Sequence, residues 1–332
     1  MHELRVGILG AGLIGSVHAA AYAATPGVKV VAVADPVAAK AARLATSAGA
    51  AAVTGLDGLL DRGLDIVSIC TPSTSHAAAT VRALGAGLHV LCEKPIARSL
   101  PDARLIVDAA ARAPGILMIA HVTRFEPDHR QAKLVVESGQ LGQVQMMTHS
   151  LTTSLPGWSE GGWISEIELS GGPLVDLAVH SFDYLSWLTG SQPVRVHAVG
   201  RDTGAGASTY AIAHVRYASG ALALVETSWA HPVSQGFKLS AEFVGTDGRL
   251  SWDYDHIAGG FLHRVEGGTV RFDPLGDNGY RAEVQSFVEA VRSTGPTPVP
   301  AEDGLAALRT SLAALESVRT GTTIDLTTWE LP

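Results

Sequence analysis

The most informative segment of this 332-residue chain is Gly10-Ala11-Gly12-Leu13-Ile14-Gly15. An apolar run, residues 4–9, precedes it and predicts a strand, and the alanine-rich residues after Gly15 predict a helix. A helix that begins on such a loop directs free N–H groups and the positive end of its dipole toward an anion, here a pyrophosphate. A glycine triplet alone is a weak signal, because loops use glycine wherever the backbone takes a positive φ.

The residue that makes the loop specific is Asp35, which follows a second apolar run, residues 28–34, twenty positions beyond Gly15. A carboxylate at this strand end can accept a hydrogen bond from a ribose 2'-hydroxyl. It repels a 2'-phosphate, and Pro36 and Val37 supply no compensating arginine. The sequence therefore predicts a dinucleotide site that favours NAD over NADP, with a purely structural turn as the alternative. Its expected residues are Gly10, Gly12, Leu13, Ile14, Gly15 and Asp35.

The pattern of apolar residues divides the chain into two expected domains. In residues 1–122, near-continuous apolar runs alternate with helical patterns, which indicates a parallel sheet buried on both faces and a doubly wound α/β domain. The expected strands are 4–9, 28–34, 66–71, 89–92 and 116–120. In residues 123–332, alternating runs with glycine-rich turns predict an α+β domain with a large, mostly antiparallel open sheet. The last helix, about 302–320, is expected to pack back on the first domain.

Composition argues against several classes of function. The formal net charge is -8, and the 24 Lys and Arg residues form no cluster, so neither nucleic acid nor an anionic membrane is an expected partner. No apolar run reaches the roughly 18 to 20 residues of a membrane span. Met1-His2-Glu3 leads directly into the first strand without a basic leader, which favours a cytoplasmic protein. His18 and the other scattered histidines form no zinc-binding array, so no metal is expected.

Ligands of an open parallel sheet bind at the carboxyl ends of its strands, and three of these ends carry polar groups. The third strand leads into Thr71-Pro72 and then Ser75-His76, which can line a cofactor while Ser75 caps the next helix. Capping and turn formation alone is the alternative. The fourth strand leads into Glu93-Lys94-Pro95, which places a cation where a nicotinamide would lie. A solvated surface lysine is the alternative there.

Further candidate residues follow the fifth strand and lie on a later helix. His121 and Arg124 fall where the two domains join; Arg124 either holds a substrate hydroxyl or carboxylate or bridges the domains. Asp176 and His180 stand four apart in a helix expected over 172–188, hence on one face. That spacing suits a carboxylate that orients an imidazole, two groups that contact one polyol, or a simple intrahelical contact.

Taken in order, these motifs resemble the Gfo/Idh/MocA family of NAD(P)-dependent oxidoreductases, which includes inositol and sugar dehydrogenases. The likeness covers essentially the whole chain and includes the Gly171-Gly172 turn before Asp176. It implies that Lys94, Asp176 and His180 meet at the nicotinamide and that the Lys94–Pro95 peptide is cis. Trp163 and Tyr280 are implied as substrate contacts, with core or oligomer contacts as the alternative. Pro173 and His121 depart from the usual family pattern, which leaves the substrate open.

The resemblance implies oxidation of a secondary alcohol on a sugar or cyclitol, with hydride transfer to NAD. His180 is the preferred base, since an imidazole titrates near ~6.5, with Asp176 fixing its tautomer and Lys94 polarising the oxygen. The alternative makes Lys94 the base. Two other functions stay open: a reductase of a keto-sugar or nucleotide sugar, and a non-catalytic NAD(P)-binding sensor. The second domain is implied to bind substrate and to form homodimers or homotetramers through its sheet.

Overall fold

The computed structural model describes residues 2–157, 162, 164–202, 208–253, 260–265, 268–272 and 278–330. The chain divides into two compact units. Unit 1 comprises Met1–Phe125 and Asp277–Leu305, and unit 2 comprises Glu126–Gly276 and Ala306–Pro332. The sequence predicted two contiguous domains, 1–122 and 123–332. The structure adds residues 277–305, from the second of these, to unit 1. Each unit is described by itself below.

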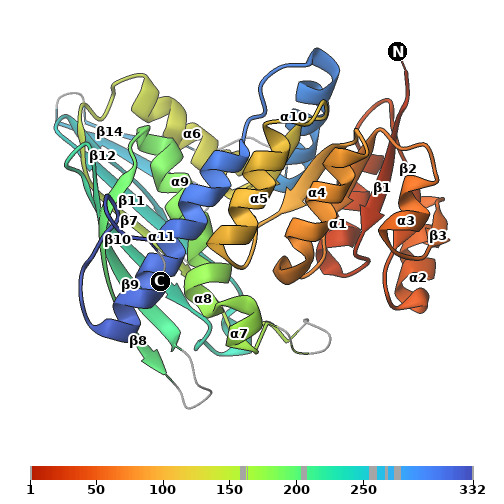
Figure 1. Ribbon diagram of the computed structural model, residues 1–332. Coiled ribbons are helices and arrows are strands. Elements are labelled where there is room, and N and C mark those ends of the chain that lie inside the picture. Colours follow the sequence, from red (N-terminus) through yellow and green to blue (C-terminus); the bar gives the residue numbers. More distant parts are fainter. Residues whose placement is uncertain are drawn as a thin grey trace. The chain divides into compact units, whose positions relative to one another are not determined.

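Unit 1 contains a six-stranded sheet in the order β3-β2-β1-β4-β5-β6, in which every pair is parallel. The expected doubly wound α/β architecture is therefore confirmed (Figure 1). Its strands are β1 (Leu4–Leu9), β2 (Val28–Ala34), β3 (Ala51–Val53), β4 (Ile66–Ile69), β5 (His89–Glu93) and β6 (Leu117–Ala120). β3 was not among the expected strands, because two of its three residues are alanines and it lacks the β-branched run typical of a buried strand.

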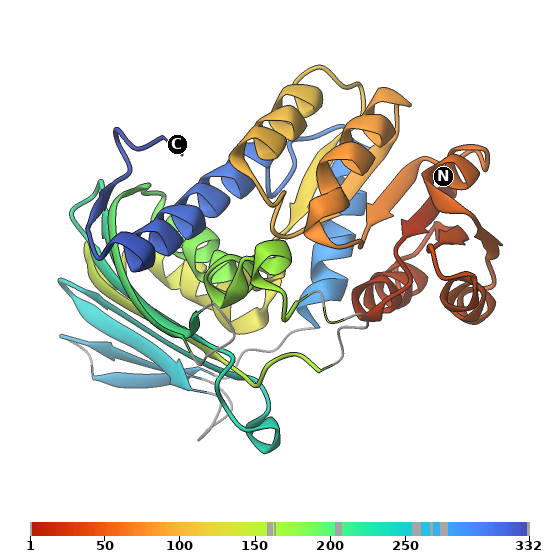
Figure 2. The same ribbon diagram turned by 60° about the horizontal axis from the view of Figure 1, so that its bottom comes forward.

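Helices cover both faces of this sheet. α4 and α5 contact each other on one face, and α1 and α10 contact each other on the other (Figure 2). Ser99 accepts a hydrogen bond from the Asp102 N–H (3.2 Å) and so caps α5. The helices of unit 1 are α1 (Leu13–Ala23), α2 (Ala38–Ala48), α3 (Gly55–Leu60), α4 (His76–Gly85), α5 (Leu100–Ala110) and α10 (Gly279–Ser293).

Unit 2 contains a nine-stranded sheet in the order β14-β13-β12-β11-β7-β10-β9-β8-β15. β7 and β10 pair in parallel and the other pairs are antiparallel, which confirms the expected mostly antiparallel sheet. Its strands are β7 (Val144–Thr152), β8 (Pro193–Asp202), β9 (Ser208–Tyr217), β10 (Leu222–Ser228), β11 (Lys238–Gly245), β12 (Gly248–Asp253), β13 (Gly260–Arg264), β14 (Thr269–Phe272) and β15 (Ile324–Asp325).

The helices of unit 2 pack on one face of its sheet. α6, α9 and α11 lie on the same side of the strands in Figure 1. Ala223 and Val225 of β10 share the buried core with Phe182 and Leu185 of α9. The opposite sheet face exposes apolar side chains, among them Met146, Val199 and Leu222. These helices are α6 (Pro127–Glu137), α7 (Ile167–Ser170), α8 (Gly172–Asp176), α9 (Ala178–Thr189) and the larger part of α11 (Ala301–Thr320).

The prediction of one helix over 172–188 is wrong, since the structure contains two helices, α8 and α9, that meet at Leu177. Leu177 has φ −104° and ψ −51°, and its N–H donates to the Pro173 carbonyl at 3.0 Å. The next turn closes one residue earlier, because His180 N–H donates to the Leu177 carbonyl at 3.2 Å. A turn of this tighter type interrupts the regular ladder and ends α8 at Asp176.

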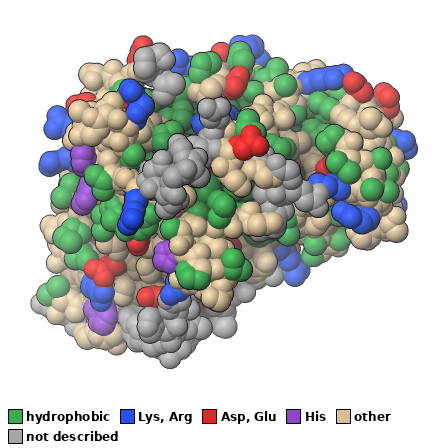
Figure 3. All heavy atoms as spheres, turned by 90° about the horizontal axis from the view of Figure 1, so that it is seen from below, with side chains coloured by type: hydrophobic (Ala, Val, Ile, Leu, Met, Phe, Trp, Pro, Cys, Tyr) green, Lys and Arg blue, Asp and Glu red, His purple; other side chains and the backbone are tan. Residues whose placement is uncertain are grey.

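The charged surface agrees with the composition. On the face shown in Figure 3, Lys and Arg side chains are spread among acidic, apolar and other side chains. Among the described residues, the structure contains no helix that is long and apolar enough to cross a membrane.

Two histidines in the core of unit 2 form a buried pair. His129 on α6 and His149 on β7 are both fully buried, and their Nε2 atoms are 3.2 Å apart. His149 Nδ1 lies 2.8 Å from the Ser181 hydroxyl. Burial lowers the pKa of His149 to about 3, and burial together with the neighbouring His149 holds the pKa of His129 well below its ordinary value. Both rings are therefore neutral in the folded protein near pH 7.

The buried pair predicts loss of stability in acid. A histidine whose pKa is lower in the folded than in the unfolded state takes up a proton on unfolding, so the stability it supports is present above about pH 6.5 and lost below it. With a folded pKa of about 3, His149 costs about 2 kcal/mol at pH 5, and His129 acts in the same direction. We expect the free energy of unfolding in urea to fall less between pH 7 and pH 5 for His149→Gln than for the wild type. Equal decreases would contradict the prediction.

Candidate active site

The glycine loop at the end of β1 has the geometry of a phosphate site. Gly10 has φ +102°, and a Cβ there would lie 2.5 Å from the Cys70 carbonyl oxygen, so only glycine fits. Gly12 is the N-cap of α1, and nothing among the described residues lies within 4 Å of where its Cβ would stand. The first N–H to make a hydrogen bond of the helical type is that of Ser16, which donates to the Gly12 carbonyl at 3.1 Å. The helix itself thus leaves the N–H groups of residues 13–15 to bind an anion.

Asp35 is held in place by the same loop. Its Oδ2 accepts from the Ala11 N–H and its Oδ1 from the Val37 N–H, both at 2.8 Å. A carboxylate offers about four acceptor positions, so both oxygens retain capacity for a ribose hydroxyl. The half-buried side chain therefore joins the glycine loop to the end of β2 with its charge fixed in orientation.

The register of the sheet brings the expected site residues of unit 1 to one edge. Leu9 pairs with Ala34 and with Ile69, and Ile69 pairs with Cys92. Because neighbouring parallel strands end at the same level, the residues that follow them leave the sheet together. These residues are Gly10, Asp35, Thr71 and Lys94.

The turn after β4 supplies hydroxyl groups and one buried imidazole. Thr71 Oγ1 and Ser73 Oγ are buried and have no hydrogen-bond partner among the described residues. Such atoms fit a bound cofactor that would supply the missing partner. Ser75 occupies the N-cap position of α4, but within the described chain its side chain makes no cap hydrogen bond. His76 is fully buried, and its ring nitrogens lie 2.9 Å from the Pro95 and Thr71 carbonyl oxygens, so it supports the turn.

The end of β5 places Lys94 in a half-buried position, and the Lys94–Pro95 peptide is cis, as the resemblance implied. Glu93 was expected as a cofactor contact, and that stays a prediction; its carboxylate lies 3.0 Å from His18 Nε2 and accepts from the Lys94 N–H at 3.1 Å. Burial alone would raise the pKa of Glu93, but His18, through its hydrogen bond and charge, and then the charges of Lys94 and His76 lower it.

His18 is a site residue that the sequence analysis missed. It lies on α1 and is fully buried, with Nδ1 2.7 Å from the Ser68 hydroxyl. The available signal was its spacing: His18 follows Gly15 by three positions, on the helix face that also buries Ala19 and Tyr22. In the sequence, His18 was considered only as a possible metal ligand, so its spacing from Gly15 was not used.

Three other expected residues of unit 1 are buried or contact protein groups. His121 is fully buried after β6. Arg124, in a short 3₁₀ turn (Val122–Phe125), is buried and donates to Asp303 Oδ2 at 2.9 Å and to the Pro298 carbonyl at 3.5 Å. Both partners belong to unit 1. The ring of Tyr280, on α10, is centred 6.5 Å from that of His18. Substrate contacts by these residues stay predictions.

In unit 2, a glycine turn positions Asp176 and His180. Gly171 and Gly172 have φ +80° and +68°, and the Gly172 N–H donates to Ser170 Oγ at 3.0 Å. Thr227 of β10 donates to the Pro173 carbonyl at 3.3 Å and so fixes the start of α8 to the sheet. Asp176 ends α8 and His180 lies in the first turn of α9, and both are half-buried. Trp163 lies outside the described residues.

These features fit NAD in unit 1. The loop offers N–H groups around an open position at Gly12, the turn after β4 offers two unpartnered buried hydroxyls within the described chain, and Asp35 offers a fixed carboxylate. The meeting of Lys94 with Asp176 and His180 at the nicotinamide stays a prediction, because Lys94 belongs to unit 1 and the other two residues to unit 2.

Comparisons with known proteins agree with this assignment. Residues 4–121 match the oxidoreductase family with an NAD-binding Rossmann fold, and residues 129–251 match the GFO/IDH/MocA C-terminal domain. An inositol 2-dehydrogenase of Rhizobium meliloti is 30% identical over 95% of this chain and 97% of its own length. A D-xylose 1-dehydrogenase (NADP+) of Haloferax volcanii is 34% identical over 81% of this chain and 82% of its own.

Among solved structures, GenD2 from gentamicin A biosynthesis, in complex with NAD, is 26% identical, with a TM-score of 0.86 over 98% of this chain and 97% of that chain. The two family matches together span more than half of the sequence. The Rossmann match covers the part with the parallel sheet, and the C-terminal-domain match covers most strands of the second sheet. The chain therefore belongs to the Gfo/Idh/MocA family of oxidoreductases and carries that family's NAD-binding Rossmann fold.

Proposed function

We propose that this protein is an NAD-dependent dehydrogenase that oxidises a secondary alcohol of a sugar or cyclitol. The observation that carries the proposal is the shared edge in unit 1, where Lys94 leaves β5 at the level at which the glycine loop leaves β1. The names of the relatives, an inositol and a xylose dehydrogenase, support the substrate class. A cytoplasmic location is part of the proposal, since Cys70 and Cys92 are both free thiols.

The residues divide into binding and proton-transfer roles. The N–H groups that begin α1 bind the pyrophosphate, and Asp35 accepts from the adenosine ribose. When bound, NAD supplies the hydride acceptor. Lys94 donates to the substrate oxygen and stabilises its developing negative charge, and His180 takes the hydroxyl proton while Asp176 holds the imidazole tautomer. In the alternative assignment Lys94 itself takes the proton.

A substrate panel tests the function. myo-Inositol, scyllo-inositol, D-xylose and methyl glucoside are each incubated with NAD at alkaline pH, and formation of reduced nicotinamide is followed by absorbance. We expect turnover with at least one cyclitol or sugar. A flat panel from protein that demonstrably binds NAD would contradict the proposal and favour the sensor or a nucleotide-sugar reductase. Oxidation of reduced NAD by a nucleotide-linked keto-sugar would then identify the reductase, and its absence would favour the sensor.

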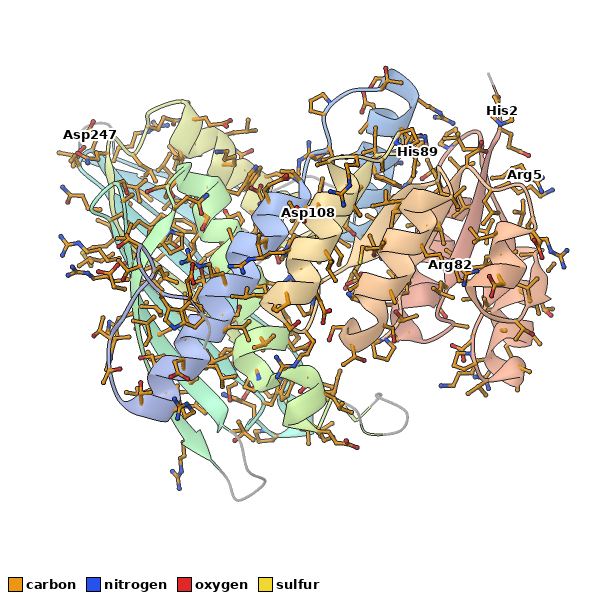
Figure 4. The ribbon with its side chains drawn as sticks, in the orientation of Figure 1. His2, Arg5, Arg82, His89, Asp108 and Asp247 are labelled. Carbon is orange, nitrogen blue, oxygen red and sulfur yellow. The ribbon has the colours of Figure 1, made fainter. Side chains whose placement is uncertain are left out.

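Asp35 is predicted to set the preference for NAD. Asp35→Asn removes the charge that repels a 2'-phosphate, so the ratio of kcat/KM with NAD to kcat/KM with NADP should fall at least tenfold, equivalent to about 1.4 kcal/mol. Asp108→Asn makes the same charge change on the exposed side of α5 (Figure 4) and should leave the ratio unaltered. An unchanged ratio in Asp35→Asn, or a wild type that prefers NADP, would contradict the assignment.

We further propose that the protein forms a homodimer or homotetramer through the face of the nine-stranded sheet opposite α6 and α9. The exposed apolar side chains of Met146, Val199 and Leu222 on three strands of that sheet support this. Light scattering on purified protein should give a mass of two or four chains, and Leu222→Lys should lower it. A wild-type mass of one chain would contradict the proposal.

A further inference from the structure

The two chain neighbours of Lys94 each contact a buried histidine that its expected chemistry does not use. On one side His18 contacts the carboxylate of the preceding residue, Glu93, whose other oxygen accepts from the Lys94 N–H at 3.1 Å. On the other side His76 contacts the carbonyl of the following residue, Pro95, at 2.9 Å. All of these residues lie in unit 1. The backbone of Lys94 is thus fixed from both directions.

The His18 side chain joins three elements of the cofactor domain. It comes from α1, its Nδ1 is 2.7 Å from the Ser68 hydroxyl on β4, and its Nε2 is 3.0 Å from Glu93 Oε1 on β5. Burial would lower the pKa of His18, but contacts with Cys70 and then Glu93 raise it well above the ordinary value. The ring and the carboxylate therefore form a buried ion pair. The helix that binds the pyrophosphate is joined by it to the residue before Lys94.

The His76 contacts require a charged ring. Both ring nitrogens lie 2.9 Å from carbonyl oxygens, of Thr71 and Pro95, and a carbonyl oxygen only accepts. A neutral imidazole has one N–H, so only the imidazolium makes both bonds. Burial opposes this charge, but the neighbouring Cys92 and the two carbonyl oxygens raise the pKa of His76 to about 9. His76 therefore joins the turn after β4 to the turn after β5 at neutral pH.

We propose that His18 and His76 are positioning residues that hold Lys94 in place for reaction, His18 through Glu93 and His76 through Pro95. The proposal depends on the catalytic role of Lys94 given above. Catalytic groups need accurate placement, and a displacement of about 1 Å can cost on the order of 100-fold in rate. Buried ion pairs restrict geometry because either partner alone is costly to bury, so this arrangement favours a single placement of the lysine. Neither histidine needs to touch substrate or cofactor.

The first measurement needs no substrate. His18→Leu removes both ring contacts, whereas His18→Gln keeps a donor toward Glu93 and offers the Ser68 hydroxyl an amide oxygen in place of the Nδ1–H donor. Amide hydrogen exchange of residues 92–98 should be at least tenfold faster in His18→Leu than in the wild type, with His18→Gln between them. His89→Gln, at the start of the same strand (Figure 4), is the control and should leave exchange of residues 92–98 unchanged. Unaltered exchange in His18→Leu would overturn the proposal.

The second measurement is turnover with the fastest substrate of the panel above, myo-inositol being the first choice. His18→Leu and His76→Leu should each lower kcat at least tenfold while the NAD dissociation constant, from quenching of tryptophan fluorescence, changes less than threefold. His18→Gln should recover part of the loss, and His89→Gln should match the wild type. A purely structural role would lower the folded fraction, not kcat per folded molecule.

A double-mutant cycle separates this proposal from the proposed function. If His18 acts through Lys94, adding His18→Leu to Lys94→Ala should lower kcat by less than twofold more. Full additivity would overturn the positioning role while leaving the catalytic role of Lys94 intact. If Lys94→Ala alone keeps wild-type kcat, the catalytic role proposed for Lys94 fails instead, and the exchange measurement still reports whether His18 fixes residues 92–98.

Discussion

Lys94→Ala is expected to lower kcat at least 100-fold with the fastest substrate of the panel, while NAD binding changes less than threefold. The size follows from the usual contribution of a positioned acid or base, about 10²- to 10⁴-fold. Lys94 is half-buried at the sheet edge that carries the glycine loop, and its backbone is fixed through Glu93. Lys29→Ala removes a cation from the exposed part of β2 and is the control, with kcat expected within twofold of the wild type.

His180→Ala should cause a loss of similar size, and the pH dependence of the two variants distinguishes their roles. If His180 takes the proton, kcat/KM of the wild type falls below the pKa of this imidazole, and that decrease disappears in His180→Ala. If Lys94 takes it, the decrease disappears in Lys94→Ala instead. Near-wild-type kcat in both variants would exclude both residues from the chemistry.

The fold of unit 1 follows closely from its sequence, because each step depends on local chemistry. The run from Leu4 to Leu9 is apolar and short, and the glycines after it become specific once Asp35 follows the next apolar run. Asp35 was identified because it directly follows an apolar run, which places it at the carboxyl end of an expected strand. The same logic identified Lys94. The sheet register confirms that these strand ends are level.

What the sequence did not reveal depends on contacts between distant residues. The contact between the Glu93 carboxylate and His18 was not anticipated, because His18 lies 75 positions earlier and nothing near Glu93 in the sequence indicates it. The two helices that meet at Leu177 were expected as one, because a turn shortened by one residue leaves the apolar spacing almost unchanged. Arg124 had two possible roles in the sequence, and its pairing with Asp303 across 179 positions could not be anticipated.

The glycines of the loop give the second large effect, because Gly10 and Gly12 are needed for different reasons. Gly10→Ala should destabilise the fold by several kcal/mol: its φ of +102° costs about 1 to 3 kcal/mol for alanine, and the added Cβ would lie 2.5 Å from the Cys70 carbonyl oxygen. Gly12→Ala should leave thermal stability nearly unchanged, since its φ is −78° and the described protein leaves its Cβ position open.

The same substitution at Gly12 should weaken NAD binding at least tenfold, because the new methyl group would stand where the pyrophosphate approaches the start of α1. Gly85→Ala, at the end of α4 with no described atom within 4 Å of its Cβ position, is the control and should alter neither property by much. Thermal unfolding and titration with NAD check the three variants. Normal NAD affinity in Gly12→Ala would mean that the cofactor does not lie over this loop, and the assignment of Asp35 to the ribose would be lost with it.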